Sequence, residues 1–310
     1  MGKVLFDALS ITSKIHSTAD FIRMLGLEQV TWETVKGAHG YQDRLYWNCI
    51  SIHYNGAEDM GIWLELTGQG CRAFETYGNG DYESIFEEVL YNKGQMNLTR
   101  LDVAYDDDEE KILNIDEVCD DTRGGQFVSK FSEWQVIEGS KGSSVTHGSM
   151  KSDLFLRIYD KAMERGFTDG RHWIRVELQL RRERATAFLT APGDIGGRFA
   201  GVLGNYLRYV DAGGYDGNKW RWPMKLYWEK LLAGAARIKL YQKPGADYNI
   251  MNLENFVYKQ AGNAISTLIE IAGEEEFKKR LGQRGTVQNP KYKALLNESV
   301  SHKKKAAALI

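Results

Sequence analysis

Three short segments of this sequence alternate apolar and polar residues with a period of two. They are RLDVAYD (residues 100–106), LFLRIYDK (154–161) and IRVELQLR (174–181). Alternate side chains of a β-strand point to opposite faces of a sheet, so each segment should have an apolar back and a polar front. The fronts carry carboxylates, cations and one tyrosine. If the strands share a sheet, these groups meet over a packed core.

The rest of the chain predicts an α+β protein around these strands. Residues 45–56 and 61–70 read as a hairpin with an Asn-Gly turn, and 17–27 and 81–94 as amphipathic helices. Residues 126–139 and 143–149 can form another hairpin. We expect a mainly antiparallel sheet with flanking helices in residues 1–190, carrying the reactive groups. We expect a helical, basic part in residues 191–310.

Composition bounds the class of protein. The chain has 310 residues and 43% hydrophobic content, enough for a sizeable core. Its 3 cysteines lie far apart and form no CxxC pair, which favours a reducing compartment over disulfides or structural zinc. No apolar run approaches the ~20 residues of a membrane span, and MGKVLFDALS is too short to be a signal sequence. The prediction is a cytoplasmic protein without a membrane partner.

Charge is unevenly distributed along the chain. From Glu75 to Asp121 there are 15 acidic and 3 basic residues, and from Arg221 to the end 16 basic and 8 acidic ones. A net charge of −2 is therefore compatible with a basic surface that binds nucleic acid, although charge runs are usually only solvated faces. The segment from Trp220 to Lys243 mixes Trp and Tyr with Lys and Arg, a composition suited to DNA but also to an ordinary amphipathic helix.

The strand fronts point to phosphate chemistry. Two carboxylates, Asp102 and Glu177, suit a hard divalent cation such as Mg²⁺ or Mn²⁺. Cations beside a metal suit a phosphate, and Tyr159 could then attack a phosphodiester to give a covalent phosphotyrosine. The plainer interpretation remains open, in which Tyr159 is a half-buried structural residue and the carboxylates form salt bridges with Arg100 and Arg175.

Four segments, in this order and spacing, resemble the replication initiation factor family. They are GIWLELTGQGCRAFE (61–75), LTRLDVAYDDDE (98–109), GSMKSDLFLRIYDKAMER (148–165) and HWIRVELQLRRE (172–183). The family contains rolling-circle plasmid replication initiators and relaxases of conjugative elements. The resemblance covers roughly residues 45 to 185 and is specific only when the motifs are taken together.

The resemblance implies roles for individual residues. Tyr159 matches the tyrosine that cuts one DNA strand, retains the 5′ end as a phosphotyrosine and frees a 3′-OH. Asp102 and Glu177 match acidic positions and are the expected metal ligands, and Arg157 and Lys161 are assigned to the scissile phosphate. Further candidates are Glu164, Asp106 and His147 for the metal or its support, and Arg175, Arg181 and Arg182 for DNA. His147 departs from the family, whose members often carry an aromatic residue there.

Several alternatives stay open at this level. The leading prediction is a metal-dependent DNA nickase and strand transferase that initiates rolling-circle replication. Alternatives are a conjugative relaxase, a non-catalytic origin-binding protein, and a phosphohydrolase in which water attacks. The sequence contains no GxxxxGK[ST] motif, so unwinding is assigned to a host helicase, as the family implies. A homodimer is suggested by the plasmid members of the family.

Overall fold

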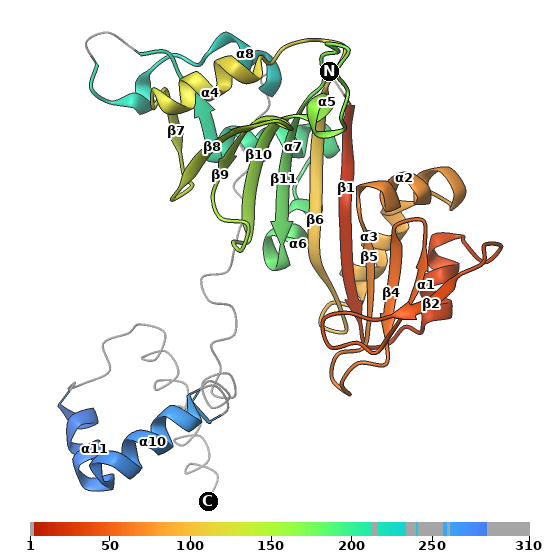
Figure 1. The fold of residues 1–310 in the computed structure, drawn as a ribbon, viewed down its shortest axis with the longest axis vertical. Coiled ribbons are helices and arrows are strands. Elements are labelled where there is room, and N and C mark those ends of the chain that lie inside the picture. The colour runs from red at the N-terminus through yellow and green to blue at the C-terminus, as the bar shows by residue number, and fades with distance from the viewer. Residues whose placement is uncertain (1–2, 213–215, 234–239, 241–256, 259–260, 284–310) are drawn as a thin grey trace, which may run out of the picture. The chain divides into compact units, whose positions relative to one another are not determined.

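The computed structural model describes residues 3–212, 216–233, 240, 257–258 and 261–283 (Figure 1). The chain divides into two compact units, Met1–Tyr241 and Gln242–Ile310. In the second unit, the described helices are α10 (Gly262–Ala272) and α11 (Glu274–Gly282).

The first unit is built on an antiparallel sheet with the strand order β2-β3-β4-β5-β1-β6-β11-β10-β9-β8. The strands are β1 (Lys3–Ser13), β2 (Glu33–Lys36), β3 (Asp43–Trp47), β4 (Ile50–Tyr54), β5 (Ile62–Leu66), β6 (Met96–Asp107), β8 (Trp134–Gly139), β9 (Gly142–His147), β10 (Leu154–Asp160) and β11 (Ile174–Arg181). A separate pair is formed by β7 (Phe127–Ser129) and β12 (Leu207–Tyr209). The predicted α+β class with an antiparallel sheet is therefore confirmed.

Helices pack on the apolar face of the sheet. They are α1 (Thr18–Leu25), α2 (Gly68–Tyr77), α3 (Tyr82–Tyr91), α4 (Ile115–Arg123), α6 (Arg182–Leu189), α7 (Ile195–Tyr206) and α8 (Leu226–Leu232). Their buried side chains form one core with the apolar residues of the strands, such as Leu9, Leu101 and Leu180. These three residues are register partners across β1, β6 and β11, so they share one face. The other face is left to polar side chains.

Some local predictions were right and others were incomplete. The two amphipathic helices are α1 and α3, and β8 pairs with β9 as expected. Residues 45–56, expected as one strand, contain the turn between β3 and β4 at Asn48 and Cys49, which both have positive φ. The sequence analysis did not identify β1 or α2. The Gly-rich segment after residue 190 falls in the part expected to be helical, and most of it begins helix α7.

The compact unit continues past residue 190. Helix α7 contacts α8, and the first unit extends to Tyr241. The segment from Trp220 to Lys243, suggested for DNA binding, is described only over residues 220–233 and 240, and the rest lies outside the described residues. Within the described part of the chain, no helix has the length and apolar character needed to span a bilayer.

Candidate active site

The register of three neighbouring strands brings the predicted polar residues onto one face. Tyr159 of β10 lies opposite Arg175 of β11, which lies opposite Asp106 of β6. Two residues further along the same strands, Arg157 lies opposite Glu177. Directly paired residues of antiparallel strands share a face, so these five side chains form two adjacent rows on the polar side of the sheet.

Tyr159 lies at the centre of this arrangement. Its ring is almost fully buried, at 2% exposure. Its hydroxyl donates a hydrogen bond of 3.0 Å to Oε2 of Glu177 and accepts one of 3.2 Å from Nζ of Lys161. The guanidinium carbon of Arg157 lies 3.9 Å from the ring centroid, a cation–π contact. The phenol is thus held by an acceptor on one side and a cationic donor on the other.

Burial also controls the acidity of the phenol. Desolvation, followed by the charge of Glu177, raises the pKa of Tyr159 above its usual value, while Arg175 acts in the opposite direction. The neighbouring cations therefore do not by themselves make the phenolate accessible. Loss of the phenol proton has to be coupled to its uptake by a neighbouring base.

Lys161 follows Tyr159 by two residues and begins the short helix α5 (Lys161–Glu164). Its side chain is buried and lies 2.6 Å from Glu164 Oε2 as an ion pair. The helix is capped by Asp160, whose Oδ1 accepts a hydrogen bond from the Met163 backbone N–H at 2.8 Å. A strand that turns directly into a capped helix therefore positions the lysine over the tyrosine hydroxyl.

Glu177 is the group whose protonation is most altered near neutral pH. Burial raises the pKa of Glu177 to about 7, and the nearby charges of Asp102 and Asp7 add to the effect. Asp102 is also buried, which raises its pKa, although its ion pair with Arg100 opposes this shift. A carboxyl with a pKa near neutrality can take up a proton in one step and release it in another.

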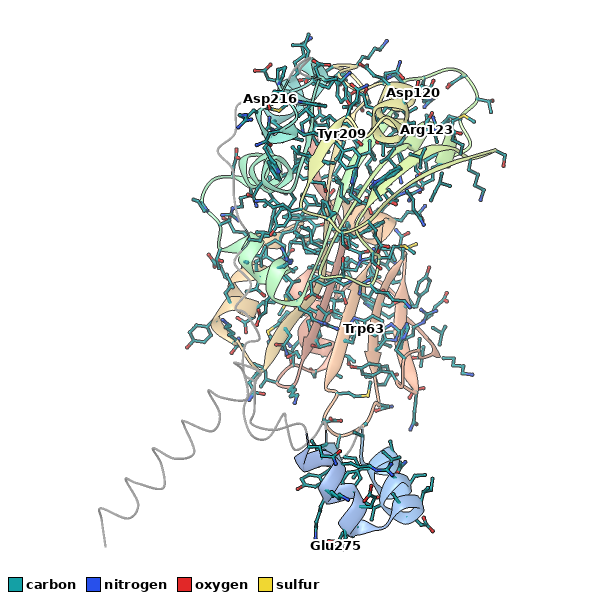
Figure 2. The ribbon with its side chains drawn as sticks, turned by 90° about the vertical axis from the view of Figure 1, so that its left-hand side faces the viewer. Trp63, Asp120, Arg123, Tyr209, Asp216 and Glu275 are labelled. Carbon is teal, nitrogen blue, oxygen red and sulfur yellow. The ribbon has the colours of Figure 1, made fainter. Side chains whose placement is uncertain are left out.

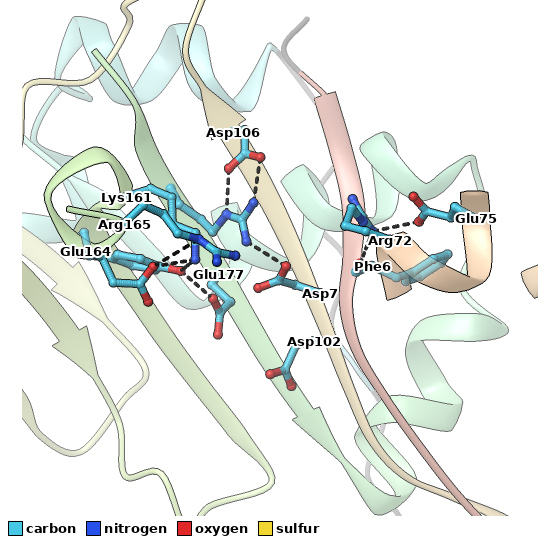
Figure 3. A network of polar contacts seen from close by, with 12 residues as sticks. Phe6, Asp7, Arg72, Glu75, Asp102, Asp106, Lys161, Glu164, Arg165 and Glu177 are labelled. Carbon is cyan, nitrogen blue, oxygen red and sulfur yellow. Dashed lines mark hydrogen bonds and ion pairs between the residues drawn. The ribbon is translucent and has the colours of Figure 1, made fainter. Parts of the chain in front are cut away.

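The carboxylates beside Tyr159 are candidate ligands for a metal ion. Figure 3 shows Asp7, Asp102 and Glu177 on the same side of the sheet. Among the residues that the structure describes, no three His, Cys, Asp or Glu side chains form a ready group for an ion. The donor chemistry still fits a hard divalent cation, because the candidates supply only oxygen ligands and their mutual repulsion raises the pKa of Glu177. Asp102 would have to exchange Arg100 for the cation.

A cavity of about 230 Å³ opens in front of these groups. Its lining includes Asp7, Glu65, Asp102, Tyr159, Lys161 and Glu177. With Glu164, which also lines it, the cavity contains the nucleophile candidate, its acceptor, its cationic donor and four further carboxylates.

The sequence analysis missed Asp7 and Glu65. Asp7 lies where the register of β1 against β6 shifts between Phe6 and Ala8, which marks a β-bulge. The bulge turns Asp7 toward the polar face, where it lies 2.7 Å from Arg175. The only local signal was a lone aspartate in the otherwise apolar run VLFDAL. Glu65 lies in the predicted strand 61–70, but nothing in the sequence placed it beside the other candidate site residues.

The remaining candidates are distributed unequally around the site. Arg175 is buried and bonds both oxygens of Asp106, at 2.6 and 2.7 Å. This geometry gives Arg175 and Asp106 a structural pairing and leaves Arg175 little exposed surface for DNA. Arg181 is partly exposed beside Arg100, its register partner. The side chain of Arg182 is 77% exposed and lies 3.5 Å from Asp153.

His147 points away from the tyrosine. Its register partner is Leu156, so it lies on the apolar face. There it is buried against Phe127, Phe131 and Tyr209, and burial lowers the pKa of His147 to about 3. Tyr209 lies next to helix α4 (Figure 2) and shares a 2.6 Å hydrogen bond with Thr122 of that helix. The geometry therefore does not bring His147 to the candidate metal ligands.

Comparison with known proteins adds independent information. Residues 96–283 match the family described as replication initiation factor. Residues 3–89 match the rolling circle replication initiation protein N-terminal domain. The chain is 27% identical over 260 residues to a Bacillus subtilis (strain 168) protein with the provisional name DNA relaxase NicK, covering 77% of this chain and 70% of that protein.

A solved structure has the same fold. It is the rolling circle replication initiator protein from Geobacillus stearothermophilus, with a TM-score of 0.68 and 29% identity. The match covers 77% of this chain and 99% of that one.

Proposed function

Because the chain belongs to the replication initiation factor family, we propose that it nicks one DNA strand at a replication or transfer origin with Tyr159 as the nucleophile. The observation that carries this proposal is the position of the Tyr159 hydroxyl. It lies between Glu177 Oε2, which accepts its hydrogen bond at 3.0 Å, and Lys161 Nζ, which donates a hydrogen bond to it at 3.2 Å. This pairing of a phenol with a base and a cation is what nucleophilic catalysis by tyrosine requires.

The proposed step conserves atoms and charge. The Tyr159 oxygen attacks the scissile phosphorus while the phenol proton passes to Glu177. A bond forms between the tyrosine oxygen and phosphorus, and the bond between phosphorus and the 3′-oxygen breaks. The leaving 3′-oxygen takes a proton from solvent and becomes a 3′-OH that can prime synthesis.

Glu177 suits the role of base for a stated reason. Its pKa of about 7 lets it be ionised before the attack and hold the proton afterwards. Attack by a 3′-OH on the phosphotyrosine would return the proton to the phenol and rejoin the strand. The linkage preserves the energy of the cut bond, so rejoining needs no nucleotide cofactor.

Two groups are proposed to bind the scissile phosphate. Lys161 is buried beside the tyrosine hydroxyl, and Arg157 lies over the ring, so both cations adjoin the site of attack. Phosphate in a partly dry cavity interacts more strongly with such fixed charges than phosphate in water. Glu164 orients Lys161 through their 2.6 Å ion pair.

A divalent cation, Mg²⁺ or Mn²⁺, would supply further charge neutralisation of the phosphate when bound. Asp102 and Glu177 are the residues proposed to hold it, with Asp7 and Glu65 as neighbouring carboxylates on the wall of the same cavity. The DNA origin is the proposed partner, and a host helicase and a second copy of this chain complete the proposal.

The experiment is a detergent-gel assay for a covalent adduct. Single-stranded DNA tiled across a candidate origin, labelled on one side of each tile, is incubated with protein and Mg²⁺ or Mn²⁺. Wild-type protein should retain the strand downstream of the nick in a detergent-resistant band, and the upstream strand should become extendable by a polymerase. Tyr159→Phe should form no adduct.

The control is Tyr91→Phe, because Tyr91 is an exposed tyrosine of helix α3, at 88% exposure. It should behave as the wild type. Cutting by both wild type and Tyr159→Phe without any adduct would contradict the proposal and favour hydrolysis by water. Binding without cutting on every tile would favour an origin-binding protein.

A further inference from the structure

A second cavity adjoins the first on the other side of Tyr159. Its volume is about 290 Å³, and it lies between the β8–β9 hairpin and the end of β10. Tyr159 and Arg157 line both cavities. The two cavities are therefore neighbours along one face of the sheet, with the tyrosine and its stacked arginine between them.

The hairpin is held close to the tyrosine by its backbone. Ser144 of β9 is the register partner of Tyr159, and Ile137 of β8 is the register partner of Ser144. At the turn, Gly142 has φ +89°, and a Cβ there would lie 2.8 Å from the Met163 Cβ and 3.1 Å from the Asp160 Cβ. Only glycine combines that conformation with that approach, so Gly142 is what lets the hairpin pack against α5.

The chemistry of the lining is that of a site for a phosphodiester backbone. Ser140, the exposed Lys141 and Ser144 line the cavity, and Ser144, the register partner of Tyr159, is on the same face of the sheet as the tyrosine. Exposed Ile137 adds an apolar contact of the size of a sugar or base edge. The one carboxylate in the lining is Asp160, and it is already engaged by the Met163 backbone N–H.

Arg157 supplies the electrostatic reason for DNA to cross at this point. Lys161, Arg175 and Arg100 are each paired with a carboxylate. Arg157 has no ion pair within the part of the chain that the structure describes, although it lies between the two cavities. Since no described carboxylate lies within ion-pairing distance of it, the guanidinium can contact phosphates on either side.

We propose that this hairpin cavity binds the nucleotide next to the scissile phosphate in single-stranded DNA, through its phosphate and sugar. This inference rests on the proposed function and extends it to a substrate subsite. The strand crosses Tyr159, with the scissile phosphate in the cavity of Glu177 and the neighbouring phosphate against Lys141 and Ser144. Contacts of this kind position the strand and do not read its sequence.

The test measures binding separately from cutting. Lys141→Ala and Ser144→Ala are made in the Tyr159→Phe background, and dissociation constants are measured for single-stranded oligonucleotides shortened one nucleotide at a time from each end. The matched control is Lys151→Ala, an exposed lysine in the loop at the opposite end of β10. The double variant should bind the full oligonucleotide about tenfold more weakly, because it loses a charged and a neutral hydrogen bond to phosphate.

The decisive result is coupling between the protein change and the DNA length. Removing the nucleotide that occupies the cavity should weaken binding of the parent protein but have almost no further effect on the Lys141→Ala/Ser144→Ala variant. Lys141→Ala should also reduce the slope of log K against log salt by about 0.7, the value for one single-strand phosphate. The effect should be the same for oligonucleotides of unrelated sequence.

Other outcomes overturn the inference without touching the proposed function. Equal losses of DNA affinity for Lys141→Ala and Lys151→Ala would mean that the hairpin has no subsite for DNA. Additive losses of affinity on shortening the oligonucleotide from both ends would mean the same. Adduct formation by proteins with an intact Tyr159 is measured in parallel with saturating DNA. If wild type forms the adduct while the hairpin variants bind normally, only the subsite fails. If wild type forms no adduct on DNA that it binds, the proposed function fails.

Discussion

The hydroxyl of Tyr159 donates its hydrogen bond to Glu177 on the neighbouring antiparallel strand, two residues beyond Arg175, the register partner of Tyr159. This diagonal contact joins a phenol whose pKa is raised by burial to a carboxyl with a pKa of about 7. The two groups titrate as a coupled pair, and the protonation of Glu177 determines whether the phenol has a base to lose its proton to. The following predictions depend on that pair and on the charges around it.

Adduct formation should require an ionised Glu177. Below the folded pKa of about 7, the carboxyl is protonated, so it cannot accept the phenol proton and binds a cation more weakly. The adduct rate should therefore fall about tenfold per pH unit on the acid side of the midpoint. Because a bound cation favours the ionised carboxylate, the midpoint should move to lower pH as the Mg²⁺ concentration is raised.

Single-turnover adduct rates at several pH values and Mg²⁺ concentrations provide the measurement. Tyr91→Phe is the control and should show the same profile. A rate that stays constant on the acid side of neutrality would show that Glu177 is not the group in question.

Glu177→Gln should make the protein more stable at alkaline pH. The folded-state pKa of about 7 is above the usual value of 4.5, so the ionised carboxylate costs stability in the folded state. The cost is absent below the unfolded pKa and complete above the folded one. Without divalent cations, the variant should be more stable than wild type by roughly 1–3 kcal/mol at alkaline pH.

Urea unfolding at two pH values tests this expectation. The difference between the proteins should shrink toward zero as pH falls to the unfolded pKa of the carboxyl. A variant less stable than wild type at alkaline pH would mean that the hydrogen bond with Tyr159 outweighs the desolvation of the charge.

Lys161→Met should slow adduct formation while the protein remains folded. Methionine preserves most of the buried length but removes the donor to the Tyr159 hydroxyl and the charge beside the phosphate. We expect a loss of about 10²–10³ in rate, typical of one lost electrostatic donor at a reacting centre. Lys93→Met, which changes an exposed lysine, is the control.

Rates at saturating DNA distinguish a chemical effect from weaker binding. If Lys161→Met has the wild-type rate once DNA is saturating, the lysine contributes only to affinity.

Arg175→Met should destabilise the fold strongly. The guanidinium bonds both oxygens of Asp106 and lies 2.7 Å from Asp7, so its removal leaves two carboxylates without their cation in a buried setting. The expected loss of unfolding free energy is roughly 3–5 kcal/mol. Arg171→Met removes an arginine of the same size whose partner Asp169 is exposed, and it should cost much less stability than Arg175→Met.

Equilibrium denaturation of the two variants gives the comparison directly. Similar losses for both would mean that the Arg175 network is as solvated as a surface pair.

Chelation should stop adduct formation without unfolding the protein. In excess EDTA the adduct band should disappear, and Mg²⁺ or Mn²⁺ should restore it. Asp102→Asn should need a higher cation concentration for half-maximal rate, because a neutral amide binds a hard cation more weakly than a carboxylate. Adduct formation that persists in EDTA would remove the cation from the proposal.

The sequence alone was sufficient for much of the local arrangement. Alternation with a period of two placed Arg157, Tyr159 and Glu177 on strand fronts, and the spacing of Tyr159 and Lys161 placed both at one strand end. These are short-range properties of the chain, so they follow from residue order without knowledge of the partners of each strand. The same reasoning predicted α1, α3 and the antiparallel α+β class.

Strand order, register and burial could be decided only by the tertiary structure. β1 is inserted between β5 and β6, far from them in sequence, and its bulge brings Asp7 to Arg175. Arg175 was predicted to bind DNA. Through this contact and its bonds to Asp106, it is a buried partner of two carboxylates. Register likewise places His147 on the apolar face. The sequence by itself determined which side chains share a strand face, whereas the packing of distant strands decided which faces meet and which charges are removed from water.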